Sequence, residues 1–270
     1  MQRSYEEELS MRRNKNKRNK FYIVISLLTL LGIVLIFSSQ ILNLFVDVRS
    51  RKISEEMPIV KTVQTKPVKY DFASVREYSL QNSLSKVDTK KVDKMGQIII
   101  PSVGVNIPIV NGTSNEALLL GAGTLKPNQQ MGKRNFAVVG HNVHDKKTLF
   151  APVENIEKNA KIYLTDKKQV WQYKVNKITI VNPDKVSVIN DQGNKKMVTL
   201  VLCTSDSLRR IIVQGDLVKT NKQNVEQQVA QVTKSSTSTY LNVNWLSFAI
   251  LGAALLVALT AVVVSLVRKN

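Results

Sequence analysis

The sequence is short of the residues that build disulfides and metal centres. Its 270 residues include one cysteine, Cys203, and two histidines, His141 and His144. A single cysteine cannot form an intramolecular disulfide. One thiolate, two imidazoles and scattered carboxylates are also too few ligands for a structural zinc site. We therefore expect no bound metal and no cofactor.

Acidic residues are also scarce. The chain has 20 Asp and Glu against 39 Lys and Arg, which gives a formal net charge of +19. A basic surface attracts polyanions, but no stretch combines basic and aromatic residues as nucleic-acid-binding motifs do. We expect no nucleic-acid partner. Anionic lipid headgroups and wall polymers remain candidates, beside a basic surface that is simply solvated.

Two long stretches lack charge altogether. Residues 21–45 and 245–267 are each long and apolar enough to cross a bilayer as a helix. Neither an A-x-A cleavage site nor a lipobox cysteine follows the first stretch, so we interpret it as an uncleaved anchor. Seven Lys and Arg precede the first stretch and two follow the second. The positive-inside rule then places both termini in the cytoplasm and residues 46–244 outside.

The two predicted spans divide the chain into seven segments. These are a basic cytoplasmic tail (1–20), a transmembrane anchor (21–45), an extracytoplasmic stalk (46–93), a compact domain (94–220), a linker rich in Gln, Asn, Ser and Thr (221–244), a second transmembrane helix (245–267) and a cytoplasmic tail (268–270). The protein is thus expected at the cell membrane, with its compact domain outside.

The compact domain has the pattern of a mainly β fold. Short apolar runs rich in Val and Ile alternate with Gly, Pro and Asn turn signals. The expected strands are residues 97–101, 105–110, 136–139, 161–164, 170–175, 177–181, 198–203 and 210–215. Short helices are expected at 115–120 and 149–156, and residues 121–124 are interpreted as a tight turn. About seven or eight short strands in such a length are typical of a closed β-barrel or a sandwich.

Three residues suited to acyl transfer lie at or near the ends of these strands. Cys203 ends one apolar run, His141 follows another and Arg210 begins a third. A cysteine attacks as the thiolate, an imidazolium favours the thiolate and can protonate a leaving amine, and a guanidinium can stabilise an oxyanion. These groups form a catalytic site only if the fold brings them together, because a lone cysteine in an apolar strand is more commonly a buried hydrophobe.

Five short motifs occur in a characteristic order along the domain. They are Gly121-Ala122-Gly123-Thr124, Gln130-Met131-Gly132, Gly140-His141-Asn142, Thr199-Leu200-Val201-Leu202-Cys203 and Arg210-Ile211-Ile212-Val213. In these motifs residues 94–219 resemble a class A sortase. The resemblance implies an eight-stranded sortase β-barrel with short helices, flanked here by the two predicted transmembrane helices. It also implies a transpeptidase that cuts LPXTG-type signals of surface proteins between Thr and Gly, forms a thioacyl-enzyme and passes the acyl group to the amine of a lipid II-like peptidoglycan precursor.

The same resemblance assigns roles to single residues. Cys203 matches the nucleophile, His141 the acid/base, and Arg210 the arginine that stabilises the oxyanion or positions the substrate. Because side chains alternate along a strand, only one of Arg209 and Arg210 can face the cysteine, and the motif favours Arg210. His144 is interpreted as a loop histidine.

The resemblance also assigns two loops. Residues 182–196 are expected to line the groove for the sorting signal, and residues 204–209 to border the cysteine and the incoming amine. Asp184, Asp191 and Glu116 are interpreted as solvated loop charges rather than as calcium ligands.

Two features depart from the class A pattern. Leu202 stands where the family has Thr or Ser before the cysteine, and the predicted C-terminal span is more typical of class C, the pilin polymerases. The class C core motifs, however, are not found. Two alternatives therefore stay open. One is a pilin-polymerising, class C-like sortase, and the other is a non-catalytic, membrane-anchored β-barrel that binds wall polymers and has an inert core cysteine.

Overall fold

The computed structural model describes the domain and only parts of the flanking segments. It covers residues 92–142, 148–204 and 206–235, with scattered positions between 21 and 52 and between 249 and 253. Only scattered positions of the predicted stalk and of both predicted spans are among the described residues. Among the residues that are described, no helix is long and apolar enough to span a membrane.

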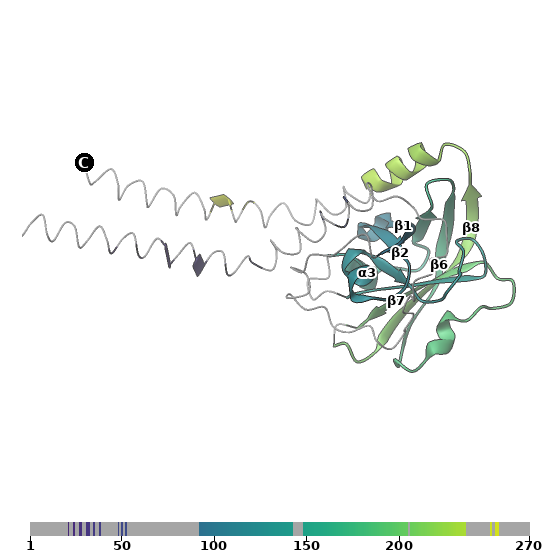
Figure 1. The fold of residues 1–270 in the computed structure, drawn as a ribbon, viewed down its shortest axis with the longest axis horizontal. Coiled ribbons are helices and arrows are strands. Elements are labelled where there is room, and N and C mark those ends of the chain that lie inside the picture. The colour runs from purple at the N-terminus through teal and green to yellow at the C-terminus, as the bar shows by residue number, and fades with distance from the viewer. Residues whose placement is uncertain are drawn as a thin grey trace, which may run out of the picture. The chain divides into compact units, whose positions relative to one another are not determined.

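Eight strands of the described domain form a closed barrel (Figure 1). They are β1 (Lys94–Ile100), β2 (Val105–Val110), β3 (Ala122–Thr124), β4 (Asn135–Gly140), β5 (Lys161–Thr165), β6 (Val170–Val181), β7 (Met197–Cys203) and β8 (Arg210–Asn221). Their order around the barrel is β1-β2-β3-β4-β7-β8-β6-β5. The expected mainly β, eight-stranded barrel is confirmed.

Short helices connect the strands. They are α3 (Asn115–Leu120) and the 3-10 helices η2 (Pro101–Val103), η3 (Ala151–Asn155) and η4 (Val186–Ile189). Ser114 caps α3, because its hydroxyl accepts a 3.2 Å hydrogen bond from the amide of Ala117. The helix expected at 149–156 is present as the shorter η3. A further helix, residues 225–235, follows β8 inside the segment expected to be a linker.

The stretch Gly121–Thr124 is not the tight turn that its glycines suggested. Its last three residues form β3, which pairs in parallel with β2 and antiparallel with β4. A Cβ atom at Gly123 would overlap the carbonyl oxygen of Gly112, and one at Gly121 would overlap that of Pro108. The glycines therefore serve a close approach of neighbouring backbones, which is the other common use of glycine in a strand.

The glycine of the Gln130-Met131-Gly132 motif also has a packing role. Gly132 has a φ of +76°, and a Cβ atom there would overlap the indole of Trp171. Its amide donates a 2.8 Å hydrogen bond to the hydroxyl of Tyr173. Burial of this hydroxyl raises the pKa of Tyr173 well above its usual value. The motif thus fixes the β3–β4 connection against β6.

Strand β7 is buried along its whole length because both of its faces are covered. Val198, Leu200 and Leu202 point into the barrel and belong to its main core. Val201 and Cys203 lie on the opposite face, in a second apolar group that we call the outer cluster. The outer cluster comprises Leu118, Leu125, Ala137, Val139, Ile189, Val201, Cys203 and Ile212, with Val181 and Val188 packed against it. The two-residue period of the strand thus separates Leu202 from Cys203.

Candidate active site

Three adjacent strands bring the predicted site residues to one edge of the barrel. β4 runs parallel to β7, with Gly140 opposite Leu202, and β8 runs antiparallel to β7, with Arg210 opposite Cys203. His141 follows Gly140 as Cys203 follows Leu202, and neighbouring strands lie about 4.8 Å apart. The fold therefore gathers His141, Cys203 and Arg210 at the ends of three consecutive strands.

The strand register also decides which face each side chain occupies. Cys203 and Arg210 are direct cross-strand partners, so their side chains share the outer face of the barrel wall. Arg209 precedes β8 and is exposed. Leu202 points the other way, into the core, and is fully buried. The register thus places Arg210, and not Arg209, beside the thiol, and it keeps Leu202 off the face that carries it.

The three side chains are almost completely buried, and one of their polar groups has no hydrogen-bond partner among the described residues. His141 is 6% exposed, Cys203 6% and Arg210 5%. Nη1 of Arg210 donates to the backbone carbonyls of Ser207 and Arg209, each at 3.3 Å. Nε of Arg210 is buried and has no hydrogen-bond partner within the described part of the chain. A buried donor without an acceptor is costly, so this N–H suits an acceptor that a substrate brings.

Asn142 connects the segment after β4 to the end of β7. Its Nδ2 donates a 2.8 Å hydrogen bond to the backbone carbonyl of Cys203 and a 3.2 Å hydrogen bond to Oε2 of Glu154 in η3. Because His141 precedes Asn142 directly, these bonds fix the backbone that carries the imidazole relative to the backbone that carries the thiol. The sequence motif contained Asn142, but nothing in it indicated this contact.

The connection between β7 and β8 is a hydrogen-bonded turn. The amide of Thr204 donates to the carbonyl of Arg209 at 3.0 Å, and its hydroxyl accepts from the amide of Arg209 at 3.0 Å. The amide of Ser207 donates to the carbonyl of Thr204 at 2.8 Å. Hydrogen bonds from the Thr204 hydroxyl and the Leu208 amide lower the pKa of Asp206. The turn therefore fixes the end of β7 relative to the start of β8.

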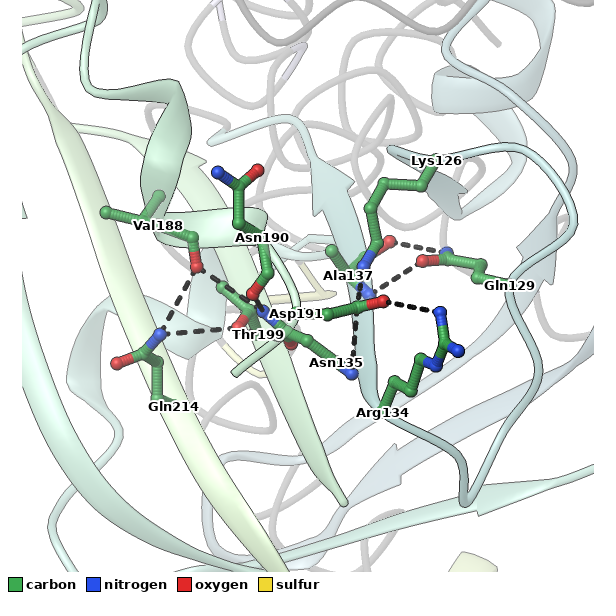
Figure 2. A network of polar contacts seen from close by, with 10 residues as sticks. All are labelled: Lys126, Gln129, Arg134, Asn135, Ala137, Val188, Asn190, Asp191, Thr199 and Gln214. Atoms are coloured by element: carbon green, nitrogen blue, oxygen red, sulfur yellow. Dashed lines mark hydrogen bonds and ion pairs between the residues drawn. The ribbon is translucent and has the colours of Figure 1, made fainter. Parts of the chain in front are cut away.

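The loop between β6 and β7 is anchored by Asp191, as Figure 2 shows. Its Oδ1 lies 2.6 Å from Nζ of Lys126 and its Oδ2 lies 3.4 Å from Nη1 of Arg134. Oδ1 also accepts a 3.3 Å hydrogen bond from the amide of Asn135, the first residue of β4. The hydrogen bond from Lys126 is the main cause that lowers the pKa of Asp191. Asp191 is an exposed loop residue, as expected, and its contacts also join this loop to the start of β4.

Two further sequence-based expectations concern metal ligands and a second histidine. His144 lies outside the described residues. Within residues 92–142, 148–204 and 206–235, no group of three or more His, Cys, Asp or Glu side chains is placed to hold a metal ion.

Comparisons with known proteins agree on one family. The model of the Sortase domain matches residues 98–218. Sortase A of Streptococcus agalactiae serotype III (strain NEM316) is 34% identical over 247 residues, which cover 86% of this chain and 99% of that protein. Sortase A of Bacillus anthracis is 35% identical over 212 residues, with 76% and 98% covered. The solved sortase A of Listeria monocytogenes is 34% identical, with 52% of this chain and 97% of that chain covered and a TM-score of 0.48.

A barrel with one thiol, one imidazole and one guanidinium at neighbouring strand ends has the groups of a cysteine acyltransferase. The family match and the full-length relatives define it further: the chain belongs to the sortase family. It is a cysteine transpeptidase that anchors surface proteins and has a class A-like catalytic domain. The alternative of a non-catalytic barrel that binds wall polymers is therefore wrong.

Proposed function

We propose that Cys203, His141 and Arg210 carry out the transpeptidation. The thiolate of Cys203 attacks the threonine carbonyl carbon of an LPXTG-type signal, and Arg210 stabilises the oxyanion that forms. The bond between the Thr carbonyl and the Gly nitrogen then breaks, and His141 gives its proton to the leaving amine. The threonine remains as a thioester on Cys203. An acceptor amine attacks this thioester, His141 takes the amine proton, and the thiolate is released.

The observation that carries this proposal is the direct pairing of Cys203 with Arg210 across β7 and β8. It puts both side chains on one face, and Nε of Arg210, which has no hydrogen-bond partner among the described residues, is a donor for a developing oxyanion. A register shift of one residue would send Arg210 to the opposite face. The pairing therefore supports Arg210, rather than Arg209, as the group that acts beside the thiol and stabilises the oxyanion.

We infer that the substrates are surface proteins with LPXTG-type signals and that the acceptor is the amine of a lipid II-like precursor. Two loops border the proposed site. In loop 182–196, Val188 and Ile189 pack on the outer cluster that contains Cys203, which supports this loop as a wall of the signal groove. Loop 204–209 joins β7 to β8, and we propose that it borders the incoming amine. Exchange of either loop with no change in signal or amine preference would contradict its assignment.

We also propose that the enzyme is held at the membrane by two helices, with its catalytic domain outside and both termini in the cytoplasm. The uncharged stretches 21–45 and 245–267 and the seven basic residues before the first support this topology. Epitope tags at both termini should then survive a protease added to intact cells, while the domain is digested. Digestion of either tag would contradict the topology.

The proposed chemistry is tested with the full-length chain in detergent, an LPXTG-type peptide and an amine acceptor. The matched control is Cys203→Ala. We expect the acceptor to be joined to the threonine of the peptide by the native chain, and neither product nor thioacyl-enzyme from the variant. Equal product from the variant would exclude Cys203 as the nucleophile. Hydrolysis without transfer would keep the nucleophile and exclude the chosen amine.

The predicted C-terminal span favours one second candidate, a pilin-polymerising sortase. In that case the acceptor is a lysine of a neighbouring pilin subunit. The products distinguish the two functions in cells that make the enzyme. Ladders of covalent polymer indicate pilin polymerisation, whereas one wall-linked species for each surface protein indicates anchoring.

A further inference from the structure

The outer face of β4, β7 and β8 carries a polar row at the end opposite to the proposed catalytic residues. Alternate residues of β7 share this face, so Thr199 lies on the same side as Cys203 and four residues before it. On β8, Gln214 lies directly opposite Thr199. On β4, the outer-facing position nearest the strand start is Asn135. We call Asn135, Thr199 and Gln214 the polar row. Thr199 and Gln214 lie about 13 Å along the strands from Cys203, and Asn135, which is in register with Met197, lies about 20 Å from it.

The three side chains of the polar row are buried and are hydrogen-bonded to one another. Asn135 is 1% exposed, Thr199 0% and Gln214 8%. The hydroxyl of Thr199 donates to Oδ1 of Asn135 at 2.8 Å and accepts from Nε2 of Gln214 at 3.5 Å. Buried polar groups in such a chain are costly unless each finds a partner. The row thus links three strands through their side chains.

The remaining donors of the polar row reach the main chain of the β6–β7 loop (Figure 2). Nδ2 of Asn135 donates to the carbonyls of Val188 at 3.4 Å and Asn190 at 3.1 Å. Nε2 of Gln214 donates to the same carbonyl of Val188 at 3.3 Å. These side-chain bonds attach η4 and the residue after it to the barrel wall.

The segment held in this way covers the apolar surface between the polar row and Cys203. Ile189 is buried in the outer cluster, and Val188 packs against it. The same cluster contains Val201 and Cys203 of β7. The height of η4 above the barrel wall therefore sets the shape of the surface next to the thiol.

We propose that Asn135, Thr199 and Gln214 are positioning residues for the sorting signal. They hold η4 over the outer cluster and so shape the wall of the signal groove beside Cys203. This inference rests on the proposed function of Cys203 and of loop 182–196. All three residues lie several positions along the strands from Cys203. Their loss therefore weakens signal binding and leaves the chemical steps intact.

The decisive variant is Asn135→Asp in the full-length enzyme. Aspartate has the shape of asparagine and still accepts from Thr199, but it has no N–H for the carbonyls of Val188 and Asn190. With an LPXTG-type peptide we expect KM to rise about tenfold or more, since the two hydrogen bonds that hold η4 to β4 are lost. We expect kcat to stay within about threefold. The rate at which a small thiol reagent labels the one cysteine, without peptide, should not fall.

Asn221→Asp is the matched control. It makes the same substitution at the last residue of β8, outside the proposed groove, where it removes a 2.8 Å hydrogen bond from Nδ2 to Oε1 of Gln228. Its KM should equal that of the native enzyme. A second variant, Gln214→Met, keeps the size of the side chain and removes its donor to Val188, and it serves if Asn135→Asp does not fold. We expect Gln214→Met to raise KM in the same direction.

The outcomes separate this inference from the function on which it rests. Native KM in the folded variants would overturn the positioning role and leave the proposed transpeptidation intact. A fall in kcat with native KM, together with slower thiol labelling, would also overturn it, since the row would then act on the reacting groups. If the native enzyme turned over none of the signal peptides tested, the proposed function and this inference would both be wrong.

Discussion

The side-chain amide of Asn142 holds the backbone carbonyl of Cys203 through a 2.8 Å hydrogen bond. The parallel ladder between β4 and β7 has its last pair at Gly140 and Leu202, so this bond lies just beyond the end of the ladder. Strand ends are the places where backbone pairing is weakest. A side-chain bond at this point keeps the segment with His141 in register with the thiol.

Asn142→Asp tests this role, because the variant keeps the shape of the side chain and loses its donor. The new carboxylate would face the Cys203 carbonyl and the carboxylate of Glu154, and both contacts would become repulsive. We expect kcat to fall about tenfold or more with little change in KM, since a misplaced imidazole affects the chemical steps. Steady-state kinetics with a signal peptide give both constants. Asn155→Asp, an exposed change in η3, is the control and should match the native enzyme. Native kcat in Asn142→Asp would contradict the role.

The two neighbouring arginines should differ sharply in their effect on turnover. Arg210 lies opposite Cys203 and is 5% exposed, whereas Arg209 is exposed before the strand begins. We expect Arg210→Gln to lower kcat by about 10²–10³, the usual effect of losing one oxyanion donor. Arg209→Gln should stay within about threefold. Transpeptidation rates of both variants decide the point, and equal losses would show that the register does not select the catalytic arginine.

The sequence pattern predicted seven of the eight strands, all except β3, and placed Cys203 and Arg210 at strand ends. Runs such as Val198–Cys203 are short, apolar and rich in β-branched residues, and this composition strongly predicts a buried strand. Once neighbouring strands are known, the last residue of one and the first of the next must meet, as Cys203 and Arg210 do. The catalytic roles of Cys203, His141 and Arg210 follow from the family resemblance instead and stay predictions.

The contacts between loops were not predictable in the same way. Lys126 and Asp191 are 65 residues apart and carry no local pattern that links them. The hydrogen bonds of Asn135 to the β6–β7 loop depend on the position of that loop. The loop has no regular strand pairing, so the sequence pattern does not fix its position. The two glycines of 121–124 predict a turn, whereas the structure uses them for a close approach of neighbouring backbones. Glycine serves either purpose, and only the tertiary structure distinguishes the two.

Leu202 fills core space, so its replacement by the family's more usual Thr should not improve catalysis. The side chain is fully buried in the main core, on the opposite face of β7 from Cys203. Leu202→Thr removes apolar volume and buries a hydroxyl, and we expect the free energy of unfolding to fall by about 1–3 kcal/mol. Denaturant unfolding measures this change. Leu202→Met, which nearly conserves volume, should cost less. A higher kcat in Leu202→Thr would show that this position acts on the site.

The anchor at Asp191 predicts a pH dependence with a definite sign. Its pKa in the folded state is lowered, first by the hydrogen bond from Lys126, so the carboxylate is favoured by folding. The stabilisation is therefore fully present above the ordinary pKa of an aspartate, about 3.9, and is lost as the pH falls through the lower folded value. The side chain is 35% exposed, so the contribution at neutral pH is about 1 kcal/mol or less. Asp191→Asn should be less stable than the native chain at pH 7 and should approach it toward pH 3. A difference that grows on acidification would contradict this assignment.

Gly140 gives the most direct test of how tightly the segment with His141 is held. It is the last residue of β4, and a Cβ atom there would overlap the side chain of Phe150, a fully buried core residue. The nearest of these atoms is Cβ of Phe150, so Gly140→Ala must displace either the whole of Phe150 or the backbone of β4. Overpacking of this kind costs about 1–3 kcal/mol, and displacement of the backbone moves His141 away from the thiol. We expect both a lower melting temperature and a kcat at least about tenfold lower.

The double variant Gly140→Ala/Phe150→Gly identifies which part of the structure yields. Glycine at position 150 removes the Cβ, Cγ and Cδ1 atoms that the new methyl group would meet, so the two changes should be non-additive in both stability and kcat. Phe150→Gly alone supplies the reference for the cavity that it creates. If Gly140→Ala is destabilised but keeps native kcat, then Phe150 moves and the backbone before His141 does not. That result would contradict a segment held in place by the core beneath it.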